Sequence, residues 1–261
     1  ALINARMNAR AFVARQRFRG LYADLYARFA HISAQDAGTA GHLEALGAGH
    51  VTATGSLKAG AGPLADQPDL RAALAGALKG RNPWCAASSH AADEAVALAA
   101  HKMLLGQNPA RLLIIAPRDP ARRDDIVAAC AAAGLSLVVR STGAVPAATD
   151  AVYLADGFGE MGLWYRLCPA ALVGGSLGDT GGHNPWEPAH LGCAVLHGPN
   201  VVNFAADYHA FHAAGAARLV ADAGQLAQAL QDPSLPDQAA RGRERRCRAR
   251  GGRPARGKDP L

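Results

Sequence analysis

The stretch Leu172-Val-Gly-Gly-Ser176, followed by Gly181-Gly-His-Asn-Pro-Trp-Glu-Pro188, has the order of an apolar strand, a glycine-rich loop and a helix. Asn184 stands where a helix cap belongs, and Pro185 takes the first helical position. Glycines allow close approach of a ligand, and a helix start attracts anionic oxygens, so Glu187 is a candidate acceptor for ribose hydroxyls. The alternative is a capping box in which Glu187 reaches back to the cap amide.

Similar units extend along much of the chain and indicate an α/β fold. Strand-like runs occur at residues 84–87, 112–116, 135–139, 151–154, 171–174, 194–197 and 217–220. Most alternate with helical stretches, at residues 93–105, 122–133, 160–167 and 206–213. This alternation predicts a parallel sheet with ligands at the carboxyl ends of its strands.

Arg118 follows one of these strand ends directly, after the buried run of residues 112–116. An arginine in this position can make charge-assisted contacts to a phosphate or carboxylate. The alternative is a surface arginine paired with Asp119 or Asp124.

Two more strand ends carry candidate residues. Residues 153–162 lead from a strand through glycines into a helix, where Glu160 can orient a ligand or simply complement the helix dipole. Ser88, Ser89 and His90 follow the first strand of the large domain. For these, an N-cap at Ser89 and a solvated His90 are the plainer interpretation, because no carboxylate is evident that would complete a catalytic triad.

Composition limits the class of protein. Half of the residues are hydrophobic and 5% are aromatic, which is typical of a globular chain. The net charge of +6 is concentrated in residues 241–261, which hold nine of the 27 basic residues, so no nucleic acid partner is expected for the rest. This tail lacks an apolar face, and we expect it to be disordered.

Other features argue against a secreted, metal-binding or membrane-spanning chain. The five cysteines are widely spaced, which favours a reducing compartment. His183, His190 and His197 are seven residues apart, unlike usual metal ligands, so no metal site is expected. No apolar run approaches the roughly 18 residues of a membrane span, and the start is not a signal peptide, so this chain is expected to be soluble.

Four regions are expected along the chain. Residues 1–58 carry βα units without enough sheet for a domain, and the start at Ala1 suggests that an upstream part is missing. Residues 59–83 are rich in Gly, Ala, Pro and Asp and are interpreted as an interdomain linker. Residues 84–240 form the complete domain, and residues 241–261 form the basic tail.

Ten short segments, taken in their order along the chain, resemble the Kdo (3-deoxy-D-manno-octulosonic acid) transferases of lipopolysaccharide assembly. They lie at residues 4–7, 34–35, 46–48, 55–58, 86–90, 117–118, 156–160, 173–176, 181–187 and 198–204. The family has a GT-B architecture of two Rossmann-like domains and transfers Kdo from CMP-Kdo to a lipid A precursor. The resemblance therefore implies a complete C-terminal Rossmann-like domain and the end of the N-terminal, acceptor-binding domain.

The resemblance also implies the residues that contact the CMP moiety. These are the residues at the family's donor motifs, namely Pro117, Arg118, Phe158, Gly159, Glu160, Asn184, Pro185, Trp186 and Glu187, with Ser88 and Ser89 at the first strand end. CMP-Kdo is the donor substrate, and no cofactor is expected. Gly157 and Phe158 replace the family's usual Thr and Met, which puts fine donor selectivity in doubt.

The family's catalytic glutamate and its N-terminal membrane segment lie outside this sequence. We therefore assign no catalytic residue and expect this chain alone not to transfer Kdo, although the whole protein is expected at the cytoplasmic face of the bacterial inner membrane. The alternatives are another GT-B glycosyltransferase or epimerase that uses a UDP-sugar, a nucleotide-binding module without turnover, or a nucleic acid binder that acts through the tail.

Overall fold

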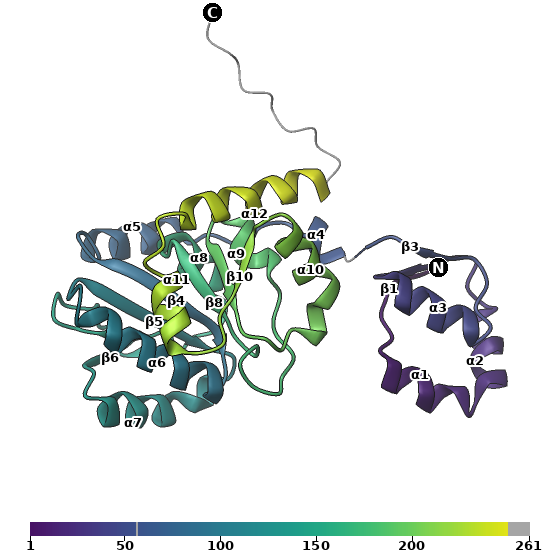
Figure 1. The fold of residues 1–261 in the computed structure, drawn as a ribbon, viewed down its shortest axis with the longest axis horizontal. Coiled ribbons are helices and arrows are strands. Elements are labelled where there is room, and N and C mark those ends of the chain that lie inside the picture. The colour runs from purple at the N-terminus through teal and green to yellow at the C-terminus, as the bar shows by residue number, and fades with distance from the viewer. Residues whose placement is uncertain (56, 250–261) are drawn as a thin grey trace, which may run out of the picture. The chain divides into compact units, whose positions relative to one another are not determined.

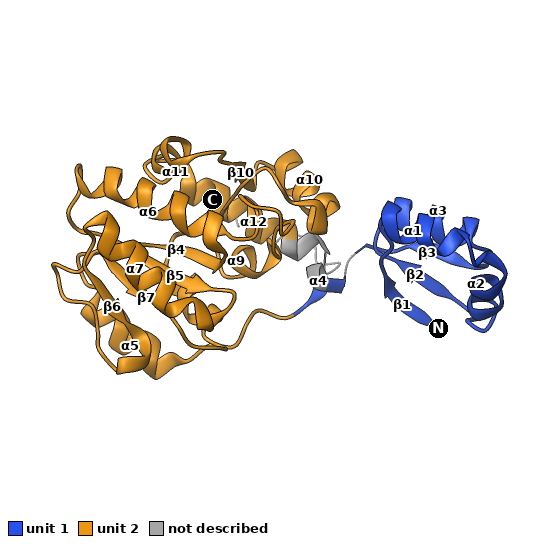
Figure 2. Cartoon of the chain, turned by 90° about the horizontal axis from the view of Figure 1, so that it is seen from below, with its two compact units in different colours: residues 1–61 blue, residues 62–261 orange. Residues whose placement is uncertain are grey.

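The chain folds into two compact units, residues 1–61 and residues 62–261, in a computed structural model that describes residues 1–55 and 57–249 (Figure 2). The predicted linker of residues 59–83 is wrong over most of its length, because residues 62–83 belong to the second unit. Helix α5 (Pro68–Ala77) lies in this segment. Leu74 and Leu78 are four residues apart, so both turn towards the core and are buried there.

The first unit contains a parallel sheet of three strands in the order β1-β2-β3. The strands are β1 (Leu2–Ala5), β2 (Ile32–Ala34) and β3 (Val51–Ala53), and the helices are α1 (Ala9–Gln16), α2 (Arg19–Tyr26), α3 (Ala37–Ala45) and α4 (Leu57–Gly60). Ile32, Leu43 and Leu46 form the centre of its core. The βα units expected in residues 1–58 are present and have a sheet and a core of their own, whereas α1 shows no apolar pattern because none of its residues is buried.

The second unit is built on a parallel sheet with strand order β10-β9-β8-β4-β5-β7-β6 (Figure 1). Its strands are β4 (Asn82–Ser89), β5 (Arg111–Pro117), β6 (Leu137–Val139), β7 (Val152–Leu154), β8 (Ala170–Val173), β9 (Ala194–His197) and β10 (Ala217–Leu219). Each corresponds to a predicted strand. Since β5 lies on one side of β4 and β8 on the other, the sheet has a topological switch point between β4 and β8, where ligands bind in such folds.

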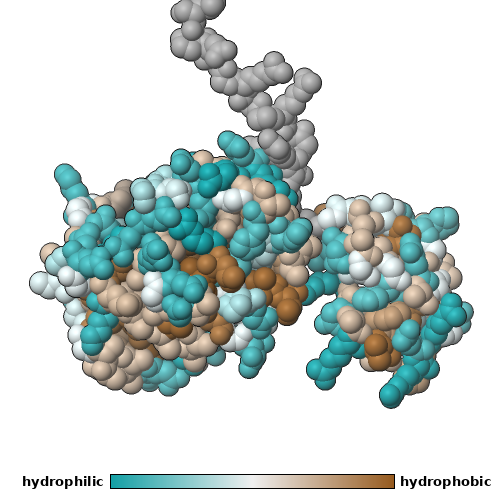
Figure 3. Space-filling view, in the orientation of Figure 1, coloured by the Kyte–Doolittle hydropathy of each residue, from teal (hydrophilic) through white to brown (hydrophobic). Residues whose placement is uncertain are grey.

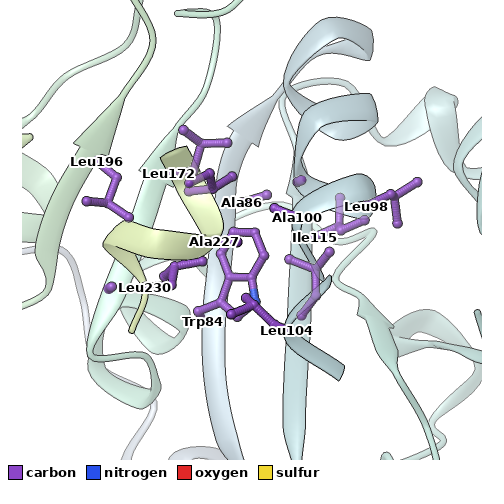
Figure 4. Close-up of a cluster of buried hydrophobic side chains, with 14 of the residues drawn as sticks. Trp84, Ala86, Leu98, Ala100, Leu104, Ile115, Leu172, Leu196, Ala227 and Leu230 are labelled. Atoms are coloured by element: carbon purple, nitrogen blue, oxygen red, sulfur yellow. The ribbon is translucent and has the colours of Figure 1, made fainter. Parts of the chain in front are cut away.

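Helices cover both faces of this sheet. They are α6 (Ala91–Leu105), α7 (Arg123–Ala133), α8 (Met161–Leu167), α9 (Trp186–His190), α10 (Ala205–Ala213), α11 (Ala223–Ala229) and α12 (Leu235–Ala249). Along β4, Trp84 packs with α6 and α11 on one face (Figure 4), whereas Cys85 packs with α5 and α8 on the other. Throughout residues 1–55 and 57–249, no helix is long and apolar enough to cross a membrane.

Helix α12 corrects the predicted tail. Disorder was expected from Arg241 onward, but the helix continues to Ala249, while residues 250–261 lie outside the described residues. Its anchors are small or polar groups: Ala239 is buried, Gln238 Nε2 donates to the Val195 carbonyl at 2.8 Å, and Arg241 Nε donates to the Gly215 carbonyl at 2.8 Å. Anchors of this kind leave no apolar period in the sequence, which explains the error.

Candidate functional site

The carboxyl ends of β4 and β8 meet unusually closely at the switch point. The Gly174 amide donates to the Ala87 carbonyl at 2.8 Å. A Cβ atom on Gly174 would lie 2.4 Å from the Ser88 carbonyl oxygen and 2.7 Å from the Ser89 Cα, so no side chain fits there. Ser88 itself has a φ of 52°, a left-handed conformation that is strained for serine and that concentrates at functional sites.

A buried carboxylate fills the backbone concavity of the glycine-rich loop. Asp93, in the first turn of α6, is fully buried and accepts hydrogen bonds from the amides of Gly175 (2.7 Å), Ser176 (3.3 Å) and Leu177 (3.1 Å), and from that of His90 (3.0 Å). Such a group of amides is where an anionic ligand commonly binds. Asp93 takes that place here, so these three amides are already bonded within the protein.

Two histidines lie across the switch point from each other. His90 Nε2 and His183 Nε2 are 2.9 Å apart, and the ring planes are within 10° of parallel. The Tyr208 hydroxyl donates to the His183 carbonyl at 3.1 Å, and the ring of His183 lies against Gly175, where a Cβ atom would approach it to 3.1 Å. His90 caps α6 and contacts His183, which differs from the solvated first-turn residue expected from the sequence.

His183, His190 and His197, which are spaced by seven residues, each have different neighbours in the fold. His197 Nε2 lies 2.8 Å from His212 Nε2, and burial lowers the pKa of His197 to about 4. The ring of His190 packs beside that of Trp186, with centroids 6.0 Å apart. Within the described residues, no three His, Cys, Asp or Glu side chains are grouped as metal ligands.

Arg118 is exposed beside this switch point. Its amide donates to the Ser89 carbonyl at 3.0 Å, which fixes the start of its loop against the end of β4. Asp119, one of the expected ion-pair partners, instead caps the next turn through the Ala121 amide at 3.0 Å. Among residues 1–55 and 57–249, no side chain pairs with the Arg118 guanidinium, so the alternative of a surface ion pair is not what the structure shows.

Ser89, predicted as a ligand contact, points into the protein. It is fully buried, and its hydroxyl donates to Glu94 Oε1 at 3.1 Å. Glu94 also accepts from Arg122 at 2.7 Å, and this hydrogen bond raises the pKa of Arg122. We therefore remove the Ser89 side chain from the candidate site and retain Ser88.

The loop after β7 presents an exposed aromatic ring and a half-buried ion pair. Phe158 is 79% exposed, and Gly159 has a φ of 81°. Glu160 precedes α8 and accepts from Arg140 at 3.2 Å. Glu160 Oε2 and Arg140 Nε are both buried and have no hydrogen-bond partner among the described residues. Buried polar atoms of this kind are uncommon and fit a site completed by a ligand.

The Asn184 and Glu187 side chains are joined at the start of α9. Asn184 Oδ1 accepts from the Trp186 amide at 3.2 Å, and Asn184 Nδ2 donates to Glu187 Oε1 at 3.3 Å. Asn184 therefore bonds to the first helical residue and holds the carboxylate, but the N-cap is Pro185, one residue later than expected. Pro185 is buried at the cap, and Glu187 is half-buried.

Trp186 is a core residue. Its side chain is 4% exposed, its indole N–H donates to Asp207 at 2.8 Å, and its ring packs edge-on against Phe211 with centroids 4.7 Å apart. The indole is satisfied inside the protein and is turned away from the candidate site. We therefore remove the Trp186 side chain from the site, although the sequence pattern had included it.

Sequence comparison links both units to one family. Residues 1–61 match the family described as 3-deoxy-D-manno-octulosonic-acid transferase (kdotransferase). The 3-deoxy-D-manno-octulosonic acid transferase of Rickettsia bellii is 30% identical over 200 residues, which are 77% of this chain and 48% of that protein. The chain thus spans about half the length of the curated relatives it matches.

Solved structures agree with this link. The C-terminal CMP-Kdo binding domain of WaaA from Acinetobacter baumannii superimposes with a TM-score of 0.64 and 31% identity, covering 68% of this chain and 96% of that chain. Trehalose-6-phosphate synthase OtsA, with a TM-score of 0.54 and 16% identity, covers 93% of this chain and 61% of its own, and shares the fold alone. The α/β, GT-B type of fold implied by the resemblance is confirmed, and this chain belongs to the 3-deoxy-D-manno-octulosonic acid transferase family.

Proposed function

We propose that the second unit binds CMP-Kdo at the carboxyl ends of β4, β5, β7 and β8, and that the protein transfers Kdo from this donor to a lipid A precursor. The observation that carries the proposal is the 31% identity over nearly all of a CMP-Kdo binding domain. The geometry supports it, because Arg118, which has no ion-pair partner among the described residues, and the strained Ser88 lie at the switch point of the sheet.

Each part of a cytidine nucleotide has a suitable partner at this edge. Arg118 offers a cation to the phosphate, and the half-buried Glu187 offers an acceptor to ribose hydroxyls. Phe158 presents an exposed ring against which a flat base can pack, and the buried Glu160 Oε2 lacks a partner in the described chain. These groups follow different strands and come together only in the folded sheet. A ligand that contacts all of them would therefore bind only the folded domain.

Nucleotide selectivity tests the proposal. In calorimetric titrations of the purified chain, CMP is expected to bind more tightly than UMP or UDP, and removal of the Arg118 guanidinium is expected to weaken CMP binding. Preference for UDP would instead favour a glycosyltransferase or epimerase that uses a UDP-sugar. We propose no metal or organic cofactor besides the donor, so EDTA should leave CMP affinity unchanged.

We also propose that the protein works at the cytoplasmic face of the inner membrane and that the first unit contributes to this contact. Figure 3 shows apolar areas on the lower part of this unit, flanked by hydrophilic side chains. Phe18, Leu21 and Leu25 follow helical spacing along α2 and are 45–68% exposed, while the opposite face of the helix lies in the core. A helix that is apolar on both faces is expected to be covered on both.

The charge around α2 favours an acidic lipid surface as the cover. Residues 9–28 contain five arginines and a single acidic residue, Asp24. Basic side chains around exposed apolar ones are typical of helices that lie at an anionic membrane interface. Binding to phosphatidylglycerol vesicles should fall in a Phe18→Ser, Leu21→Ser variant and should persist in Met103→Ser, which removes a similarly exposed residue from α6. Equal binding by all three proteins would refute this contact.

A further inference from the structure

We infer that His90 and His183 act together as the receptor for the phosphate group of the nucleotide. This inference rests on the proposed function and assigns one part of the ligand to one pair of side chains. The two imidazoles face each other across the switch point, with Nε2 atoms 2.9 Å apart. They come from segments that end β4 and follow β8, the two strands between which a ligand is expected.

The first reason is that the usual phosphate donors are already used. In many nucleotide-binding folds the amides of a glycine-rich loop bind the phosphate. Here the amides of Gly175, Ser176 and Leu177 all donate to the buried Asp93 carboxylate. These three amides are therefore already used, and the side chains at the switch point are the donors that face a phosphate there.

The second reason is that the histidine pair can be opened by an anion. Two Nε2 atoms at 2.9 Å require one N–H donor and one unprotonated acceptor. If a phosphate oxygen enters between the rings, the N–H···N bond is replaced by two N–H···O bonds. Both rings then present an N–H on Nε2, and the ring that accepted before needs only the shift of its proton from Nδ1 to Nε2.

The surroundings hold both rings in place. From α6, the Asp93 carboxylate accepts from the His90 amide, and from α10 the Tyr208 hydroxyl donates to the His183 carbonyl. Burial keeps the pKa of Tyr208 far above its usual range, so this group stays neutral. The segments around the pair also carry charged side chains, namely Glu94, which pairs with Arg122, Asp207, which accepts from Trp186, and the exposed Arg118 and Asp179.

Cytidine is the matched probe, because it lacks only the phosphate of CMP. The experiment measures the affinities of CMP and cytidine for the wild-type chain, His90→Gln and His183→Gln by calorimetry. The ratio of the two affinities is expected to fall about 10-fold or more in each variant, which corresponds to the loss of one hydrogen bond to a charged group. The affinity for cytidine should stay the same.

The ratio of the CMP affinity to the cytidine affinity is a readout that a merely structural role would not change. It should fall in both variants and stay at the wild-type value in a control variant. His209→Gln is the control, because His209 is exposed on α10. Thermal melting of each variant checks that the fold is retained, and His183→Gln serves where the loss of the His90 cap affects folding.

The outcomes separate this inference from the proposed function. If the wild-type chain binds neither CMP nor cytidine, both are wrong. If CMP binds but the ratio of CMP to cytidine affinity is unchanged in both variants, only the histidine receptor is wrong. A lower ratio in His90→Gln and His183→Gln, but not in His209→Gln, would establish it.

Discussion

The Asp93 carboxylate accepts a hydrogen bond of 2.7 Å from the Gly175 amide, which lies 82 residues further along the chain. This bond ties the start of α6 to the loop after β8, and the two ends of the switch point thereby become one rigid unit. Asp93 is fully buried and accepts from four backbone amides, so backbone dipoles stabilise its carboxylate.

We predict that Asp93→Asn is strongly destabilising. The new amide group has one acceptor oxygen and would direct an NH2 group at backbone N–H groups, so some of the four donors would lose their partner. The expected loss of unfolding free energy is about 2 to 4 kcal/mol, from one or two unsatisfied buried groups. Urea denaturation measures it, with Asp69→Asn in the exposed first turn of α5 as the control. Equal midpoints for the two variants would contradict this role of Asp93.

Gly174→Ala should be destabilising and should also weaken CMP binding. The added Cβ would lie 2.4 Å from the Ser88 carbonyl oxygen, so the ends of β4 and β8 must move apart. Overpacking at such a site typically costs about 1 to 3 kcal/mol. Gly76→Ala is the matched control, because its Cβ meets open space on α5 and the change should be neutral or slightly stabilising. Melting temperatures and CMP titrations of both variants test the prediction.

The strands and their ends could be predicted from the sequence, because each strand is a short apolar run followed by a polar or glycine-rich turn. The same pattern predicts Arg118 and Glu187 as candidate site residues. Partners such as His90 and His183 could not be predicted, since they are 93 residues apart and no local pattern links them. Asp93 escaped notice because its position at the start of a helix has a sufficient local explanation in the helix dipole.

Arg118→Ala is expected to weaken CMP binding by about 1 to 3 kcal/mol, the usual effect of removing a charged hydrogen-bond donor. Stability should hardly change, because the guanidinium is exposed and pairs with no side chain in the described part of the chain. Calorimetry with CMP measures the effect, and Arg28→Ala on the first unit is the control for a lost surface charge. Unchanged affinity would exclude Arg118 from the site.

Glu187→Gln separates capping from binding. Glutamine can still accept a hydrogen bond from Asn184 Nδ2, so the start of α9 and the melting temperature should be preserved. A ribose hydroxyl donates more strongly to a carboxylate than to an amide oxygen, so CMP affinity should fall. Glu44→Gln, exposed on α3, provides the comparison. Intact CMP binding with a lower melting temperature would show that Glu187 serves only the helix cap.

The last prediction concerns acid stability. His101 is fully buried, where Trp84 Nε1 donates to its Nδ1 at 3.2 Å and its Nε2 lies 2.8 Å from the Ala151 carbonyl. Burial lowers its pKa from 6.5 to about 4, and the pKa of His197 is lowered similarly. Between these values the unfolded chain binds more protons than the folded one. Stability is therefore complete above pH 6.5 and falls as the pH drops towards 4.

Protonated His101 would place an N–H on Nδ1 opposite the indole N–H of Trp84, so the folded state resists the proton. At pH 5 each of the two histidines is expected to lower the unfolding free energy by about 2 kcal/mol relative to pH 7.5. Urea denaturation at both values measures this loss. His101→Gln should be less stable than wild type at pH 7.5 but should lose about 2 kcal/mol less on acidification, whereas the exposed His209→Gln should follow wild type. If His101→Gln showed the same pH dependence as wild type, the acid sensitivity would have to come from other groups.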